Sequence, residues 1–289
     1  MVTLENDRVR VQVITKGAEL HSIYSKEHDL EYLWSGDAKF WNRKSPILFP
    51  VVGTLKNNTY FYKDKSYNLP RHGFARDMEF QVTETSAHSA TLTLTDNEQT
   101  ELNFPFQFRL DVVYTLSSDT VHVKYMVLNT GNNNMFFSIG SHPAFNVPLE
   151  KNLDYQDYYF EFNQIENGYR WLISREGLIE PNTVPFLINT NVLPITKELF
   201  RDDALVFKYL NSNAVKLKSD KSSHGVEVSF PGFPFIGLWA APGADFVCIE
   251  PWCGIADSTT STQQLINKEG INLLTPAQAF ERTWSVRLF

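Results

Sequence analysis

The sequence predicts an all-β protein, a large antiparallel β-sandwich with very little helix. Three observations support this prediction. Apolar and polar residues alternate with a period of two in segments such as ATLTLT at 90–95, and this period is that of a half-buried strand. Turn-forming residues recur about every ten residues, a spacing typical of sandwiches and barrels. Aromatic residues make up 14% of the chain, and they favour strands.

A strand is predicted wherever an alternating segment ends in a turn signal. In VHVKYMVLN, which ends before TGNNN, the alternation places Val121, Val123, Tyr125 and Val127 on one face. The predicted strands cover residues 8–14, 60–69, 90–97, 109–116, 121–129, 214–220, 225–230, 245–250 and 283–289. A helical turn is predicted only at 194–200 and around 262–268.

The composition indicates one domain and excludes several classes of protein. No linker, repeat or low-complexity segment divides the chain, so residues 1–289 are predicted to form a single domain. The net charge of −7 argues against nucleic acid or an anionic membrane as a partner. With only two cysteines, no long apolar run and no leader-like segment, we expect a soluble protein of the cytoplasm.

Glu250 is the most informative polar residue. It follows four apolar residues and precedes Pro251 and Trp252 in VCIEPWCG. A charged, unpaired carboxylate in a dry strand costs several kcal/mol, so Glu250 must be hydrogen-bonded, ion-paired or functional. Burial would also shift its acidity towards the range of a general base.

His142 is the second candidate. It ends a strand-like segment in SIGSHPAFN, where Pro143 favours an extended backbone and stops further pairing. A histidine in such a turn is either a satisfied core residue or an acid/base group, and the segment alone favours neither.

A third candidate is the turn RHGFAR, where Arg71 and Arg76 flank His72. It is either an exposed basic turn or a half-buried site, and arginine offers a fork of donors that suits hydroxyl or phosphate oxygens. Asp203 comes just before an apolar strand in RDDALVF, and this segment alone indicates a turn-forming residue.

Taken in order, these segments resemble the aldose 1-epimerase (galactose mutarotase-like) family. The resemblance rests on RHGFAR at 71–76, SHPAFN at 141–146 and EPWCGIADS at 250–258, with WSGDAKFW at 34–41 and SPILFPVVG at 45–53 resembling the N-terminal third. It spans the whole chain and is closest in character to the LacX-like branch, known from lactose-utilisation contexts.

The resemblance implies a galactose mutarotase-like sandwich with a sugar cleft, and interconversion of aldose anomers without a cofactor or metal. It implies that Glu250 is the general base, His142 the general acid and His72 a group that stabilises the substrate. Asp203 would hold ring hydroxyls, and Trp252 belongs to the same motif as Glu250. Because the two catalytic groups act on two oxygens of one ring, we expect them to face each other across the cleft.

One departure from the family bears on the substrate. The LacX-like branch often has Arg after the Gly of the FPVVG-like segment, whereas Gly53 here precedes Thr54. We hypothesise that Arg71, helped by Lys56 or Arg76, supplies the missing positive donors. Whether the substrate is a free hexose or a hexose phosphate stays open.

Three other functions fit parts of the sequence. A sugar-binding or sugar-sensing protein without turnover would use the same aromatic contacts, from Trp34, Trp239 or Trp252, but would not need both a Glu and a His. A zinc enzyme would use His72, His142 and Glu250, although close ligand spacing is missing. A glycosidase would need two opposed carboxylates. The sequence allows a homodimer but does not predict one.

Overall fold

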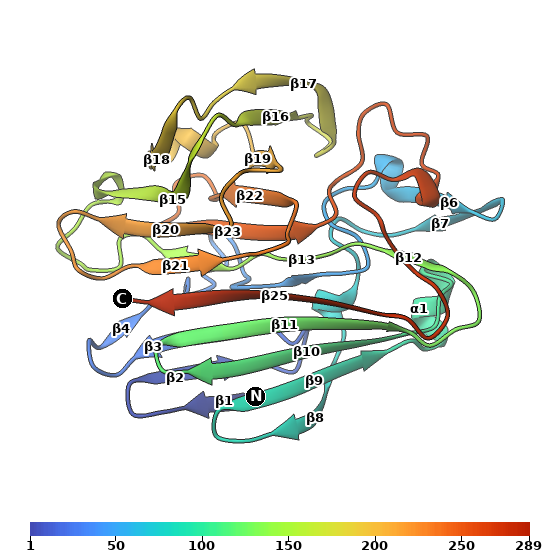
Figure 1. Cartoon of the computed structure of the whole chain (residues 1–289), viewed down its shortest axis with the longest axis horizontal. Coiled ribbons are helices and arrows are strands. Elements are labelled where there is room, and N and C mark those ends of the chain that lie inside the picture. The colour runs from blue at the N-terminus through green and yellow to red at the C-terminus, as the bar shows by residue number, and fades with distance from the viewer.

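Antiparallel strands form most of the regular structure, and the two largest sheets pack face to face (Figure 1). The computed structural model describes residues 1–289. A core of 65 buried residues joins them, to which a smaller four-stranded sheet also contributes. The predicted antiparallel sandwich is therefore confirmed.

The larger sheet has nine strands, and Figure 1 shows its central members running side by side across the lower half of the view. In spatial order they are β18 (Thr190–Pro194), β15 (Tyr158–Glu166), β20 (Ala214–Ser219), β21 (Val226–Ser229), β25 (Ala279–Leu288), β11 (Thr120–Asn129), β10 (Phe108–Ser117), β9 (Ser89–Thr95) and β8 (Gln81–Thr85).

The second sheet has eight strands and carries the candidate site. In spatial order they are β17 (Ile179–Pro185), β16 (Tyr169–Ile173), β19 (Leu205–Lys208), β22 (Phe235–Trp239), β23 (Phe246–Cys253), β13 (Ile139–Ser141) and β5 (Ile47–Leu48), with β14 (Ala144–Asn146) paired to β23.

Three smaller sheets complete the β structure. They consist of β1 (Val2–Glu5), β2 (Val9–Val13), β3 (Leu20–Ser25) and β4 (Leu30–Glu31); β6 (Thr59–Tyr62) with β7 (Lys65–Asn68); and β12 (Met135–Phe137) with β24 (Asn272–Leu274). None of the helices has the length and apolar composition that crossing a membrane requires.

The alternation read from the sequence places side chains correctly in β11. Val121, Val123, Tyr125 and Val127 are all fully buried in the core between the sheets, and the residues between them are partly exposed. Burying one face of the strand fixes its register, because a shift by one residue would turn all four side chains out of the core.

Two local predictions were wrong. Residues 60–69 form the hairpin β6–β7 and not one strand, because Lys63 and Asp64 both take positive φ and turn the chain back. The helix α1 (Glu98–Asn103), at the right of Figure 1, was not predicted; the Asn97 side chain caps it by accepting from two backbone N–H groups. The segments 194–200 and 262–268 contain the 3₁₀ turns η4 (Lys197–Phe200) and η5 (Leu265–Asn267).

Strand β23 carries the candidate site, and both of its faces are buried. Val247 and Ile249 belong to the core between the sheets. Cys248, Glu250 and Trp252 occupy the alternate positions and therefore point to the opposite face of the sheet. That outer face is where the predicted site residues gather.

Candidate active site

A cavity of about 350 Å³ opens on the outer face of the eight-stranded sheet. Strands of the sheet form its floor, and Arg71, His72 and Arg76 of the loop RHGFAR also line it. Its lining residues are Trp41, Gly53, Arg71, His72, Arg76, His142, Ile173, Gly177, Ile179, Asp203, Ala204, Val206, Trp239, Glu250, Trp252, Ile255 and Ala256. Apolar walls with a few polar groups are typical of small-molecule sites, and this volume suits a single sugar ring better than a long saccharide.

Trp252 forms part of the floor because two glycines make room for its indole. A Cβ atom on Gly237 would lie 2.5 Å from the ring, and one on Gly140 would lie 2.7 Å from it. These glycines stand on the strands at either side of β23. The flat aromatic surface next to Glu250 suits the apolar face of a sugar.

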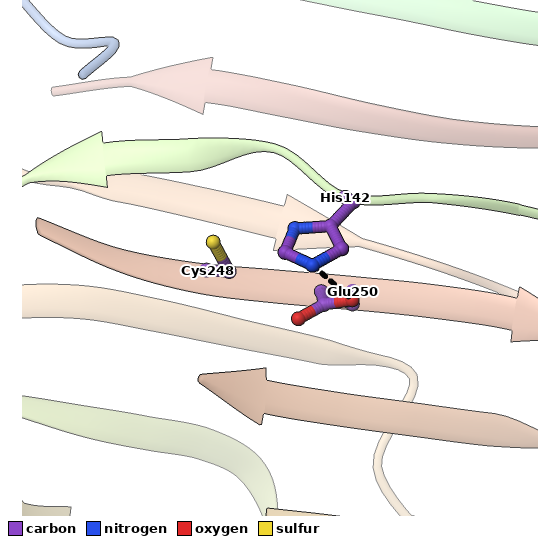
Figure 2. A group of neighbouring side chains, drawn as sticks. All are labelled: His142, Cys248 and Glu250. Atoms are coloured by element: carbon purple, nitrogen blue, oxygen red, sulfur yellow. Dashed lines mark ion pairs between the residues drawn. The ribbon is translucent and has the colours of Figure 1, made fainter. Parts of the chain in front are cut away.

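His142 lies in the short connection between β13 and β14, both of which pair with β23. Its ring packs against two neighbouring indoles, with centroid distances of 4.7 Å to Trp41 and 5.5 Å to Trp239. Its Nε2 atom is 3.2 Å from Oε2 of Glu250, as the dashed line in Figure 2 marks. The two groups were expected to face each other across the cleft; instead they touch.

Burial keeps this pair close to electrical neutrality. It raises the pKa of Glu250 well above its ordinary value, an effect that Arg71 opposes and Asp203 reinforces. Burial lowers the pKa of His142 to about 3, and Arg71 adds to the shift. Both shifts disfavour the charged forms. At any pH between the lowered pKa of His142 and the raised pKa of Glu250, the pair therefore holds one proton in total. A reaction that uses one acid and one base requires this protonation state.

Two N–H groups point at the ring of His72. The backbone N–H of Gly53 donates to Nδ1 over 3.1 Å, and the Nε–H group of Arg71 is directed at Nε2 over 3.3 Å. Burial lowers the pKa of His72 well below its ordinary value, and His142 and Arg71 add to the effect. His72 is therefore neutral, and with one free nitrogen lone pair it can accept from only one of these two donors at a time.

Arginine side chains hold the loop around His72. Arg71 Nε–H, which points at His72 Nε2, sets the guanidinium beside the imidazole. The Arg76 guanidinium donates to the carbonyl of Arg71 over 2.8 Å and braces this loop.

Arg71 also faces an acceptor. Its Nη2 lies 3.9 Å from Oδ1 of Asp203, and the Arg71 side chain is 49% exposed. Both His72 and Asp203 have φ in the left-handed region, at 70° and 79°. Such backbone strain in residues other than glycine is common at functional sites.

Thr54 and Arg71 both approach Gly177, a residue of the cavity wall. A Cβ atom built on Gly177 would lie 2.8 Å from Oγ1 of Thr54 and 3.4 Å from Nη1 of Arg71. That Arg71 compensates for Thr54 stays a prediction.

The structure brings together seven of the eight predicted site residues. Lys56 is the exception: its ammonium donates to the carbonyl oxygens of Thr259 and Ser261, and it does not line the cavity. Trp34 is also outside the cavity, in an apolar cluster beneath Trp41. Trp41 itself was missed, although it ends the WSGDAKFW segment.

The group best placed to bind a metal differs from the zinc set considered from the sequence. His142, Cys248 and Glu250 offer ligand atoms that all lie within 4.8 Å of one another, whereas His72 is not part of this group. Figure 2 shows these three side chains gathered over β23.

Comparison with known proteins gives the family. The sequence model of the aldose 1-epimerase family matches residues 1–265. The plasmid-encoded protein LacX of Lactococcus lactis subsp. lactis is 33% identical, over 99% of both chains. The chain belongs to the aldose 1-epimerase family.

Solved structures of similar proteins agree with this assignment. A galactose mutarotase related enzyme from Lactobacillus acidophilus is 34% identical, with a TM-score of 0.96 over 100% of this chain and 97% of that one. A galactose mutarotase-like protein from Lactobacillus casei is 30% identical, with a TM-score of 0.94 over the whole of both chains. Membership in the aldose 1-epimerase family supports a sugar substrate and an epimerase-type function.

Proposed function

We propose that this protein is an aldose 1-epimerase that interconverts the α and β anomers of a hexose or a hexose phosphate by acid/base ring opening. The observation that carries the proposal is the 3.2 Å contact between His142 Nε2 and Glu250 Oε2 in the wall of a cavity of about 350 Å³. One buried acid and one buried base, held together where a single sugar ring fits, are the groups that this reaction needs.

Direct contact between the two groups suits the reaction. The C1 hydroxyl and the ring oxygen are bonded to the same carbon, so neighbouring groups can reach both oxygens. Glu250, as carboxylate, removes the proton of the C1 hydroxyl, and His142, as imidazolium, donates a proton to the ring oxygen. This ionic form arises from the neutral pair when one proton crosses the 3.2 Å contact.

The ring then opens and recloses without net consumption of protons. The bond between C1 and the ring oxygen breaks as the C1 carbonyl forms, and the aldehyde rotates about the bond between C1 and C2. Reclosure returns one proton to O1 from Glu250 and one from the ring hydroxyl to His142. No step requires a redox group or a transferable group.

The remaining lining residues account for sugar binding in this proposal. His72 and Arg71 bind sugar oxygens, Asp203 accepts from a hydroxyl, and the indole of Trp252 packs against an apolar face of the ring. The rival function, sugar binding without turnover, uses the same contacts but has no need for the buried acid/base pair.

Mutarotation of freshly dissolved α-galactose and α-glucose, followed by polarimetry, tests the proposal. Glu250→Gln should lower the enzymatic rate by about 10²-fold or more, while sugar binding measured by calorimetry persists. Glu27→Gln, a change at an exposed carboxylate, is the control and should leave the rate unchanged. Sugar binding by the wild type with no rate above the spontaneous reaction would establish the binding protein instead.

We also propose that residues 1–289 act as one domain in a reducing compartment. The shared core of 65 residues and the two free cysteines support this. A single cooperative unfolding transition, seen at the same midpoint by fluorescence and circular dichroism, is the expected result; two separate transitions would contradict it.

A further inference from the structure

Cys248 has no role in the acid/base reaction, yet it lies beside both groups that perform it. Cys248 and Glu250 are two residues apart on β23, so their side chains point to the same face of the sheet. His142 is brought next to them because β14 pairs with β23, with Ala144 opposite Cys248. In the view of Figure 2 the imidazole lies to the right of the thiol and above the carboxylate.

The thiol has unused coordinating capacity, and the imidazole already faces the carboxylate. Cys248 is fully buried, in an apolar cluster that includes Phe246 and Ala244, and it forms no disulfide. His142 presents its Nε2 atom to Oε2 of Glu250 over 3.2 Å. A soft sulfur, an imidazole nitrogen and a carboxylate oxygen therefore converge within 4.8 Å, next to a cavity that small solutes can enter.

We propose that His142, Cys248 and Glu250 form a binding site for a thiophilic divalent cation, and that an ion bound there inhibits the enzyme. The three residue types are zinc ligands, and three protein ligands with a fourth position open to a cavity match the pattern of accessible zinc sites. The thiolate selects Zn²⁺ or Cd²⁺ over Mg²⁺ and Ca²⁺, which prefer oxygen ligands.

Binding requires small movements and the loss of two protons. The contact between His142 and Glu250 already has the length expected between neighbouring metal ligands, and the thiol must approach them. The protons of the Cys248 thiol and of the acid/base pair leave for solvent as the ion enters. With both catalytic groups coordinated, no acid or base is available to a sugar. This inhibitory consequence rests on the proposed epimerase function, whereas the binding site does not.

The test uses CdCl₂ as the probe, with two readouts on the full-length protein. The first is the ultraviolet charge-transfer absorption of a cadmium–thiolate bond, which is independent of activity. The second is the mutarotation rate. Cys248→Ala removes the proposed ligand, and Cys253→Ala is the matched control, because Cys253 is on the same strand but packs into the core between the sheets.

We expect the wild type and Cys253→Ala to show the thiolate absorption and to lose activity as Cd²⁺ is added, with recovery on chelation. Cys248→Ala should lack the absorption, keep its activity without metal and need at least about tenfold more Cd²⁺ for inhibition. A saturating sugar should weaken the inhibition of the wild type. Cys248→Ser provides the same comparison if the alanine variant does not fold.

Two results would overturn the proposal: no thiolate absorption in the wild type, or equal Cd²⁺ sensitivity in Cys248→Ala and the wild type. Loss of activity on chelation of the untreated protein, with recovery on adding Zn²⁺, would overturn the inhibitory role. If the absorption depends on Cys248 but no preparation turns over sugar, the metal site stands and the proposed epimerase function fails.

Discussion

The imidazole of His142 and the carboxyl group of Glu250 are 3.2 Å apart, and their side chains are only 11% and 2% exposed. Because burial disfavours charge on each group, the pKa of His142 falls to about 3 and that of Glu250 rises. A histidine and a glutamate that would ordinarily both be charged at mildly acidic pH are thereby converted into a neutral pair, in which the single proton rests on the carboxyl group and not on the imidazole.

The pH dependence of kcat/KM should reflect this pair. Activity requires the singly protonated form, so it should fall as the pH rises through the raised pKa of Glu250. On the acid side it should stay high well below pH 6.5 and fall only near the His142 pKa of about 3. Polarimetric rates corrected for the spontaneous reaction, with folding checked at each pH, measure both limbs. An acid limb near pH 6.5 would contradict the assignment.

Replacing Arg71 should reveal the class of substrate. Arg71→Ala removes a half-exposed guanidinium from the cavity wall, and charge-assisted hydrogen bonds to phosphate are stronger than those to hydroxyls. We expect the affinity for galactose 6-phosphate and glucose 6-phosphate to fall by about tenfold or more, and that for the free hexoses to fall less. Arg8→Ala, at a remote exposed ion pair, is the control. Unchanged affinity for all four sugars would remove Arg71 from the site.

His72 should make the stability of the protein depend on pH. Its pKa in the folded protein is well below 6.5, so the unfolded chain binds one more proton than the folded one below pH 6.5. The free energy of unfolding therefore falls as the pH decreases from that value, by about 1.4 kcal/mol per pH unit for this group. His72→Asn should reduce the slope by that amount, since Asn can accept from Gly53 and tolerates positive φ. Urea denaturation at several pH values measures it. His88→Asn, at an exposed histidine, should leave the slope unchanged.

Gly237→Ala should damage the floor of the cavity. The new methyl group would lie 2.5 Å from the Trp252 indole, which must shift into the cavity or distort the sheet. Overpacking of this kind costs about 1–3 kcal/mol, and we expect KM to rise more than kcat falls, because the sugar loses its packing surface. Gly131→Ala, where the added atom meets nothing closer than 3.4 Å, is the control. Wild-type kinetics in Gly237→Ala would exclude Trp252 as a binding surface.

Much of the fold could be predicted because the clearest strands have one buried and one exposed face. β11 is the best example, since each alternate residue is fully buried. β16 and β17 were missed because their residues are mostly half-buried or exposed, so no alternation appears. The β6–β7 turn was missed because Lys63 and Asp64 adopt positive φ without the glycine that usually marks such turns.

The centre of the site could be predicted, but not all of its rim. Glu250 is an ionisable residue in an apolar strand segment, and His142 is one in a turn that ends a strand. Both of these unusual placements can be recognised from the sequence alone. Trp41 and Lys56 have no comparable signal, because their positions depend on how loops fold over the sheet. Lys56 was included for its charge alone, and the carbonyl groups of a neighbouring loop bind that charge instead.

The alternation along β23 has a consequence for how the family can diversify. A shift of one residue in the register of β23 would put Ile249 in the cleft and the Glu250 carboxylate in the apolar core. The acid/base pair and the core between the sheets can therefore change only together. Arg71 and Asp203 project from connections between strands and are under no such constraint. Relatives that prefer different sugars should therefore differ in these connections while keeping the sheet beneath them.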